Sequence, residues 1–283
     1  MLRKKTSSSR LKSSNTFVVV SDSVYLRYVI PLLNSIDRNC PQPDINLLLI
    51  NCKNSEIEAI QSAHPSVKIH LQDLDFRDEE SKRSYCANCR AKFILTLLDQ
   101  GYGKLLYLDA DSLVRKKLDQ LWQIVEKNDL TILLRESSKY ERNKCATGII
   151  GVTNNLASRQ FLERWSQLIS SNEDKWFNDQ IFFYRTHLQL KSTVSVGQLP
   201  QKFIDWEFHS NSPIWVGKGP RKDNDLIYEL EEKLYADKMA YKVTISHCFQ
   251  VGFARCRRVI HRAWRSSFNF VMSALARIGL VRK

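Results

Sequence analysis

Short runs of apolar residues alternate along this chain with longer segments in which apolar residues recur about every three or four positions. The short runs predict buried strands, and the spaced segments predict helices with one apolar face. The predicted strands are residues 16–20, 45–50, 67–71, 105–108, 130–134, 146–152 and 242–246. The predicted helices are residues 25–36, 55–63, 85–98, 118–125, 156–169 and 175–187.

The order of these elements predicts the fold class. Strands and helices alternate from residue 16 onward, which is typical of an α/β protein with a mostly parallel sheet and helices on both faces. The charged segment 73–83 predicts a loop, residues 191–216 hold short strands, and residues 218–221 predict a turn.

Three polar residues interrupt predicted helix faces that are otherwise apolar. Arg90 lies on the packing side of helix 85–98, where an arginine commonly extends its charged end to solvent. Asp179 and Gln180 interrupt helix 175–187, whose aromatic and aliphatic residues cover most of its circumference and predict a largely buried helix. Buried polar groups need partners, so these side chains either make structural hydrogen bonds or belong to a site.

Two carboxylates follow a short, bulky apolar run that predicts a buried strand. The strand 105–108 is followed by Asp109 and Asp111, at the sheet edge where open α/β sheets bind ligands. Two neighbouring carboxylates repel each other unless a cation lies between them, and carboxylate oxygen suits Mg²⁺ or Mn²⁺. The alternative is a solvated turn. The pattern favours a metal ion that bridges to phosphate oxygens.

The net charge of +13 lies at the two ends of the chain. Residues 1–15 contain basic but no acidic side chains, and so do residues 253–283. The part between them is balanced, whereas a nucleic-acid-binding domain would carry its basic residues on a folded face. This distribution points to an anionic surface that the ends of the chain contact.

The C-terminal segment has the pattern of a basic amphipathic helix. Its apolar stripe is Ile260, Trp264, Phe268, Val271, Leu275 and Ile278, with Arg258, Arg262 and Arg265 off the stripe. We expect residues 257–283 to lie on an anionic membrane surface as an interfacial element. The alternative is that the stripe docks on the protein's own core. The expected domains are a disordered basic leader (1–15), a catalytic domain (16–256) and this tail (257–283).

Cysteine usage and hydropathy bear on the compartment. Seven cysteines, an odd number, favour a reducing compartment over a disulfide framework. Cys86 and Cys89 have the spacing of a zinc site, but no second pair completes it. No apolar run approaches the length of a membrane-spanning helix. The expected location is cytoplasmic, at the inner face of the plasma membrane.

A series of short motifs matches a known pattern. They are Asp22-x-x-Tyr25, Arg90-x-Lys92, Asp109-x-Asp111, Thr147-Gly148, Asp179-Gln180 and Ser246-His247. Together they resemble the retaining glycosyltransferases of family 8, which include bacterial lipopolysaccharide galactosyl- and glucosyltransferases and glycogenin. The resemblance implies a GT-A fold and a nucleotide-sugar donor, which is a UDP-sugar in most members. It also implies Mn²⁺ (or Mg²⁺) and a saccharide or lipid-linked acceptor.

The resemblance also implies roles for single residues. The donor would be bound by Asp22, Tyr25, Arg90, Asp109, Ala110, Asp111, Thr147, Gly148, Gly252 and Arg255. The metal ion would be held by Asp109, Asp111 and His247, and the catalytic pair at the anomeric carbon would be Asp179 and Gln180.

The chain departs from the family pattern at two places. The run from His247 to Arg255 is two residues longer than usual, has arginine in place of lysine and lacks the following Pro-Trp. Arginine also binds phosphate, with a different geometry. Phe203-Ile-Asp205 stands where a segment ending in Phe-Asn is usual. These departures affect the identity of the sugar and acceptor more than the type of reaction.

The expected mechanism is a front-face transfer. A retaining double displacement needs a nucleophile beside the anomeric carbon, and Gln180 is a poor one. The acceptor hydroxyl would therefore attack directly, with Asp179 and Gln180 positioning the sugar. Two alternatives stay open: a haloacid-dehalogenase-type phosphohydrolase that uses Asp109 and Asp111, and an inactive protein that binds sugar nucleotides.

Overall fold

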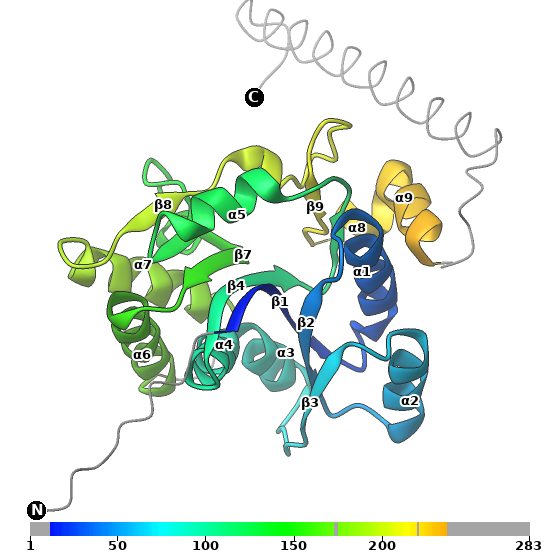
Figure 1. The fold of residues 1–283 in the computed structure, drawn as a ribbon. Helices are drawn as coiled ribbons and strands as arrows, with labels where there is room; N and C mark the ends of the chain where they lie inside the picture. Colours follow the sequence, from blue (N-terminus) through cyan, green and yellow to red (C-terminus); the bar gives the residue numbers. More distant parts are fainter. Residues whose placement is uncertain (1–11, 173–174, 220, 237–283) are drawn as a thin grey trace, which may run out of the picture. The chain divides into compact units, whose positions relative to one another are not determined.

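A computed structural model describes residues 12–172, 175–219 and 221–236 (Figure 1). The chain divides into two units, residues 1–218 and residues 219–283, and each is described by itself. In the second unit the described helices are α8 (Arg221–Asn224) and α9 (Leu226–Ala236). No helix in the described part of the chain is long and apolar enough to cross a bilayer. The elements below belong to the first unit.

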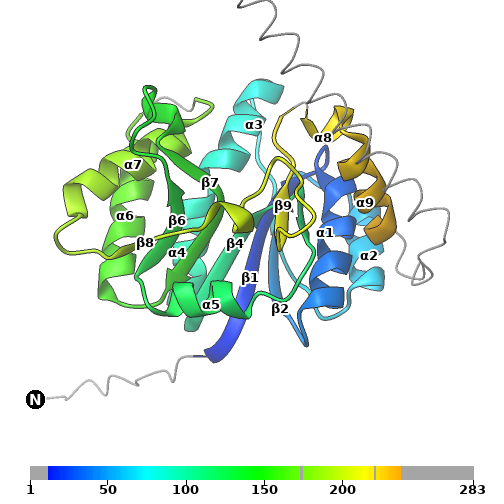
Figure 2. The ribbon, with the colours of Figure 1, turned by 90° about the horizontal axis from the view of Figure 1, so that it is seen from above.

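A seven-stranded sheet forms the centre of the first unit, in the order β3-β2-β1-β4-β7-β6-β8. Its strands are β1 (Lys12–Asp22), β2 (Asp44–Ile50), β3 (Lys68–Gln72), β4 (Tyr102–Asp109), β6 (Leu130–Leu134), β7 (Cys145–Thr153) and β8 (Val196–Gln198). Strands β1 to β4 are parallel, β7 is antiparallel to both β4 and β6, and β8 is parallel to β6. Figure 2 shows β2, β1, β4, β7 and β6 side by side. The predicted α/β architecture is confirmed.

Helices cover both faces of this sheet, because successive side chains of each strand point to opposite sides. In β1, Phe17 and Val19 join the core under α1 (Leu26–Asn39), α2 (Asn54–Ala63) and α5 (Asp119–Glu126). Val18 and Val20 join the second core, under α4 (Arg90–Asp99), α6 (Leu156–Ser170) and α7 (Asn178–Leu190). In Figure 1, α5 and α4 lie on opposite sides of the sheet.

A second, two-stranded sheet positions the turn that follows β4. In it β5 (Ser112–Val114) pairs antiparallel with β9 (Ile214–Val216). Two 3₁₀ turns, η1 (Glu141–Asn143) and η2 (Gln201–Phe203), connect the larger elements. The small sheet therefore brings residues 214–216 to the Asp109–Asp111 turn, about a hundred positions away in sequence.

The expected loop at 73–83 is wrong from Glu79 onward, and the expected helix at 85–98 is two helices. Helix α3 runs from Glu79 to Asn88, and α4 follows after Cys89. The Asp78 side chain accepts a hydrogen bond from the backbone N–H of Ser81 at 2.7 Å. An aspartate cap followed by acidic residues in the first turn stabilises a helix start, and this local effect outweighs the lack of an apolar stripe.

Two other boundaries differ from the prediction. Helix α7 begins at Asn178 instead of residue 175, because Phe177 has φ of +74°, which a helix cannot include. Trp176 precedes the helix and is 42% exposed, so the expected burial is wrong there. Strand β1 begins at Lys12, and its backbone pairs with β4 at Tyr102, so residues 12–15 belong to the strand. The predicted strand 242–246 and helix from 257 onward lie outside the described residues.

Candidate active site

The carboxyl ends of β1 and β4 bring two of the predicted site acids to one edge of the sheet. The strands are parallel neighbours, and Val20 is opposite Asp109. Asp22 ends β1 and is buried; its Oδ1 accepts a hydrogen bond from the backbone N–H of Tyr25 at 2.9 Å. The Nζ of Lys82 lies 4.0 Å from its other oxygen. Asp22 is thereby fixed at the start of α1.

Arg90 is the centre of the site. It is only 6% exposed, so the interpretation that it extends to solvent is wrong. Its Nε donates to the carbonyl oxygen of Ala87 at 2.6 Å, and one terminal nitrogen donates to the carbonyl of Thr147 at 2.7 Å. The same terminal nitrogen lies 3.3 Å from Asp109 Oδ1 and 3.6 Å from Asp179 Oδ2. One guanidinium therefore connects α3, β7, the end of β4 and the start of α7.

The electrostatics of Arg90 follow from its partners. Burial works against the charged form, but Tyr107, Asp109 and Asp179 outweigh it, and the pKa of Arg90 is raised. The guanidinium carbon lies 4.8 Å from the centre of the Tyr107 ring. The hydroxyl of Tyr107 donates to Asp109 Oδ1 at 2.9 Å. Burial raises the pKa of this hydroxyl as well, so it stays a hydrogen-bond donor.

Asp179 belongs to the interior of the site. It is 2% exposed, and its carboxylate accepts a hydrogen bond from the Thr147 hydroxyl. Trp165 Nε1 donates to the backbone carbonyl of Asp179 at 3.0 Å. Burial raises the pKa of Asp179, while Arg90 and the Thr147 hydroxyl act in the opposite direction. In this arrangement Asp179 positions Arg90 and Thr147.

The turn from Asp109 to Asp111 is the accessible part of the site. The side chain of Asp109 is 31% exposed, whereas Asp111 is buried. A Cβ atom on Gly148 would lie 2.8 Å from Asp109 Oδ2 and 3.6 Å from Val216 Cγ1. Because any side chain at residue 148 would push into the carboxylate, the glycine leaves the space that Asp109 occupies.

Gln180 is fixed by the corner between η1 and β7. In the amide orientation that satisfies both its nitrogen and its oxygen, the nitrogen faces this corner and donates to the carbonyl oxygens of Arg142 at 2.8 Å and Cys145 at 2.9 Å. The thiol of Cys145 donates to the backbone carbonyl of Gln180 at 3.0 Å. With the nitrogen used on the backbone, the amide oxygen is the atom of Gln180 that can stabilise positive charge.

The acids of the Asp109–Asp111 turn fit a divalent cation. Two carboxylates two residues apart supply the hard oxygen ligands that Mn²⁺ and Mg²⁺ prefer, and the exposed part of Asp109 gives access. Within residues 12–172, 175–219 and 221–236, no group of three His, Cys, Asp or Glu side chains forms a metal site. The predicted third ligand, His247, lies outside this part, as do Gly252 and Arg255.

Comparison with known proteins decides the family. The family model described as "Glycosyl transferase family 8" matches residues 15–187. The chain belongs to glycosyltransferase family 8. It is therefore a glycosyltransferase, and the phosphohydrolase alternative is wrong. No curated protein matches the chain at the level of its sequence.

Solved structures support the fold of this family 8 glycosyltransferase. The galactosyltransferase LgtC in complex with donor and acceptor sugar analogs is similar with a TM-score of 0.53 and 17% identity, over 73% of this chain and 88% of LgtC. An active-site mutant of LgtC has a TM-score of 0.52 and 16% identity, over 73% of this chain and 88% of that chain. The glycosyltransferase GlyE of Streptococcus pneumoniae has a TM-score of 0.53 and 13% identity, over 88% of this chain and 64% of GlyE. At these identities the likeness shows the GT-A fold.

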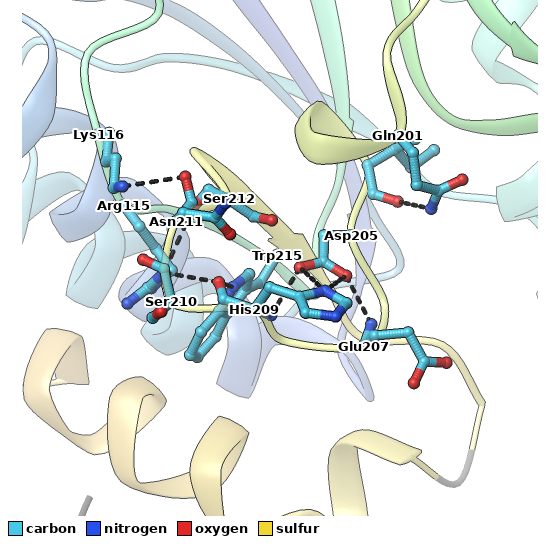
Figure 3. A network of polar contacts seen from close by, with 11 residues as sticks. Arg115, Lys116, Gln201, Asp205, Glu207, His209, Ser210, Asn211, Ser212 and Trp215 are labelled. Carbon is cyan, nitrogen blue, oxygen red and sulfur yellow. Dashed lines mark hydrogen bonds and ion pairs between the residues drawn. The ribbon is translucent and has the colours of Figure 1, made fainter. Parts of the chain in front are cut away.

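The glycosyltransferase also contains a site feature that the sequence interpretation missed, the loop 205–215 (Figure 3). The buried Asp205 carboxylate accepts hydrogen bonds from the backbone N–H groups of Glu207 at 2.8 Å and His209 at 2.7 Å. Trp215 Nε1 donates to the His209 carbonyl at 2.8 Å, and the Arg115 guanidinium lies 3.7 Å from the Trp215 ring centre. This network fixes the loop at the start of β9.

The loop is connected by backbone hydrogen bonds to the turn from Asp109 to Asp111. Asp205 forms a parallel backbone bridge with Trp215. In it Asp205 N–H donates to the Ile214 carbonyl at 3.2 Å, and Val216 N–H donates to the Asp205 carbonyl at 3.0 Å. The next residue, Gly217, donates its N–H to the carbonyl of Asp111 at 2.8 Å. The sequence pattern identifies Asp205 only as a departure from the family pattern. Its position two and four residues before the groups it binds is the local signal of a turn-forming aspartate.

Replacement of Gly148 with alanine is expected to lower transfer turnover by about a hundredfold with little loss of stability. The added methyl group displaces the Asp109 carboxylate, and a shift of about 1 Å at a reacting centre has an effect of this size. Thermal unfolding and steady-state kinetics of the purified variant measure both quantities.

A matched control is Gly151→Ala in the same strand. Its methyl group would lie 2.4 Å from Val125 Cγ2 in the core, away from Asp109. We expect a loss of about 1–3 kcal/mol in the free energy of unfolding and normal turnover of the folded fraction. Equal turnover in both variants would contradict the role of Gly148.

Proposed function

We propose that this glycosyltransferase moves a hexose from a UDP-sugar to a saccharide or glycolipid acceptor, with retention of the anomeric configuration and with Mn²⁺ or Mg²⁺. The observation that carries the proposal is the Arg90 network. One buried cation holds the metal-site acid Asp109, the Asp179 carboxylate and the Thr147 backbone together at the carboxyl edge of the sheet.

The donor would lie along this edge, from β1 to β7. Asp22 and Tyr25 at the end of β1 would contact the base, since a carboxylate can accept the imide N–H of uracil and a phenol ring can stack on it. The diphosphate would then lie at the Asp109–Asp111 turn. When bound there, a divalent cation would act as a Lewis acid on the diphosphate oxygens.

The side chains of this chain would orient the sugar and stabilise the charges that develop. Arg90 fixes the Asp109 carboxylate and places positive charge close to the leaving diphosphate. The Gln180 amide, held by the Arg142 and Cys145 carbonyls, can direct its oxygen toward the positive charge that develops at the anomeric carbon. Asp179 holds the Arg90 guanidinium by an ion pair and accepts a hydrogen bond from the Thr147 hydroxyl, so it keeps these two groups in position.

The bond changes are those of a front-face substitution. The bond between the anomeric carbon and the phosphate oxygen breaks, and its electron pair stays on the departing diphosphate. The acceptor oxygen forms the new bond on the same face, and its proton passes to the departing phosphate oxygen. No protein nucleophile is needed, which agrees with a glutamine at residue 180.

Thermal stabilisation of the purified full-length protein by nucleotide sugars tests the donor. We expect UDP-hexoses with Mn²⁺ to raise the melting temperature, while GDP- and CMP-sugars do so much less, because a ligand stabilises the folded state that binds it. At a free nucleotide-sugar concentration about a hundredfold above Kd, binding raises the free energy of unfolding by about 2.7 kcal/mol. Equal effects of all three nucleotides, or stabilisation that EDTA leaves unchanged, would contradict the proposal.

A further inference from the structure

A cluster of two cations and one indole ring lies outside the network described above. The guanidinium carbon of Arg135, just after β6, lies 5.3 Å from the centre of the Trp206 ring. The Nζ of Lys218, just after β9, lies 4.4 Å from the centre of the same ring. Both cations lie against the same ring, so an anion bound beside it would be attracted by two positive charges.

Arg135 is the residue in the cluster whose binding capacity is unused. Its Nε and one terminal nitrogen are buried and have no hydrogen-bond partner in the described part of the chain. Burial lowers the pKa of this arginine. A buried guanidinium nitrogen without a partner is costly, and an anionic oxygen is the strongest acceptor that could satisfy it.

The cluster lies next to the residues of the transfer site. Leu134 pairs with Cys145 in the sheet, and the backbone N–H of Arg135 donates to the Lys144 carbonyl at 2.7 Å. Cys145 in turn contacts the Gln180 backbone. On the other side, Lys218 follows Gly217, whose N–H donates to the Asp111 carbonyl. The cluster is therefore connected to both Gln180 and the Asp109–Asp111 turn.

The sheet order indicates which substrate the cluster faces. Asp22, the expected base contact, ends β1, whereas Arg135 follows β6, two strands beyond β4. The donor base and the cluster therefore lie on opposite sides of the Asp109–Asp111 turn. The acids near Arg135 do not supply the missing partner: Glu136 is exposed, and Glu141 accepts two hydrogen bonds from Arg185, at 2.8 and 2.9 Å.

We propose that Arg135 and Lys218, arranged on Trp206, bind an anionic group of the acceptor, so that the acceptor is a saccharide carrying a phosphate or a carboxylate. This inference rests on the proposed function, because it assigns the donor to the β1 side of the site. The donor's own diphosphate is the other source of the same chemistry, and the experiment separates the two.

Calorimetric titration of the full-length protein with UDP and Mn²⁺ present tests the inference. The probes are glucose 6-phosphate, glucuronate and neutral glucose. We expect one of the two anionic sugars to bind at least about tenfold more tightly than glucose, as one charge-assisted hydrogen bond provides. Arg135→Gln and, separately, Lys218→Gln should remove this preference. Lys127→Gln, the same charge change on an exposed residue after α5, should leave it intact.

Three results would overturn the inference: no preference for either anionic sugar in the natural protein, an unchanged preference in both cluster variants, or an equal loss of UDP affinity in those variants. The last result would assign the cluster to the donor diphosphate. Failure of the proposed function gives a different result, since UDP would then not bind to the natural protein at all.

Discussion

Replacement of Arg90 with methionine is expected to lower the free energy of unfolding by about 3–5 kcal/mol at neutral pH and to abolish measurable transfer. Methionine keeps much of the side-chain length but leaves Asp179, which is 2% exposed, without its cation. Removal of one partner from a buried ion pair is costly because the other charge stays in the interior. Urea unfolding followed by far-ultraviolet circular dichroism measures the loss.

The loss should depend on pH. Burial already raises the pKa of Asp179, and Arg90 is a group that lowers it, so the variant raises this pKa further. An acid whose pKa is raised in the folded state stabilises the fold at low pH, and this contribution is lost as the pH rises through the folded pKa. The difference between the natural protein and the variant should therefore be smaller at about pH 5 than at about pH 8.

The control is Arg185→Met. Arg185 pairs with Glu141 on the surface, and exposed pairs contribute at most about 1 kcal/mol. Equal losses in both variants, or a loss in the Arg90 variant that does not change with pH, would show that Arg90 does not hold a buried charge.

The second large effect is expected for Asp111→Asn. Asparagine has nearly the same shape but removes one anionic oxygen from the Asp109–Asp111 turn, where we propose that the metal ion binds, so we expect Mn²⁺-dependent turnover to fall by at least about a hundredfold. The backbone carbonyl that accepts from Gly217 is unchanged, and the fold should be kept. Turnover is measured as release of UDP over a range of Mn²⁺ concentrations.

Asp75→Asn, on the exposed segment after β3, is the matched control and should retain full turnover. If the Asp111 variant keeps its turnover, or if a higher Mn²⁺ concentration fully restores it, Asp111 is not needed in the transition state. Calorimetric unfolding of both variants shows whether any loss comes from misfolding.

The sequence predicts the sheet well where local pattern and packing agree. Residues 45–50 and 105–108 are mostly apolar because both faces of their strands are covered, and both are strands in the structure. The prediction is wrong where a local backbone effect is stronger than the pattern. Asp78 caps a helix that has no apolar stripe, and the left-handed conformation of Phe177 delays the start of α7.

The candidate site is predictable only in part, because many of its contacts join residues that are far apart in the sequence. Asp109 and Asp111 follow a buried strand, so their place at the sheet edge can be derived from the sequence. The partners of Arg90 cannot, because Thr147 and Asp179 lie 57 and 89 positions further along the chain and meet it only through the fold. The same holds for Arg135, Trp206 and Lys218, which belong to three separate segments.

Hydrolysis of UDP-hexoses by the full-length protein in the absence of acceptor, with Mn²⁺ and then with EDTA, tests the central claim most directly. The account predicts slow release of UDP and hexose from at least one UDP-hexose. It also predicts loss of this release with EDTA and in the Asp111→Asn and Arg90→Met variants. Release that continues in EDTA, or that both variants retain at the natural rate, would contradict a metal-dependent transfer site built around Arg90.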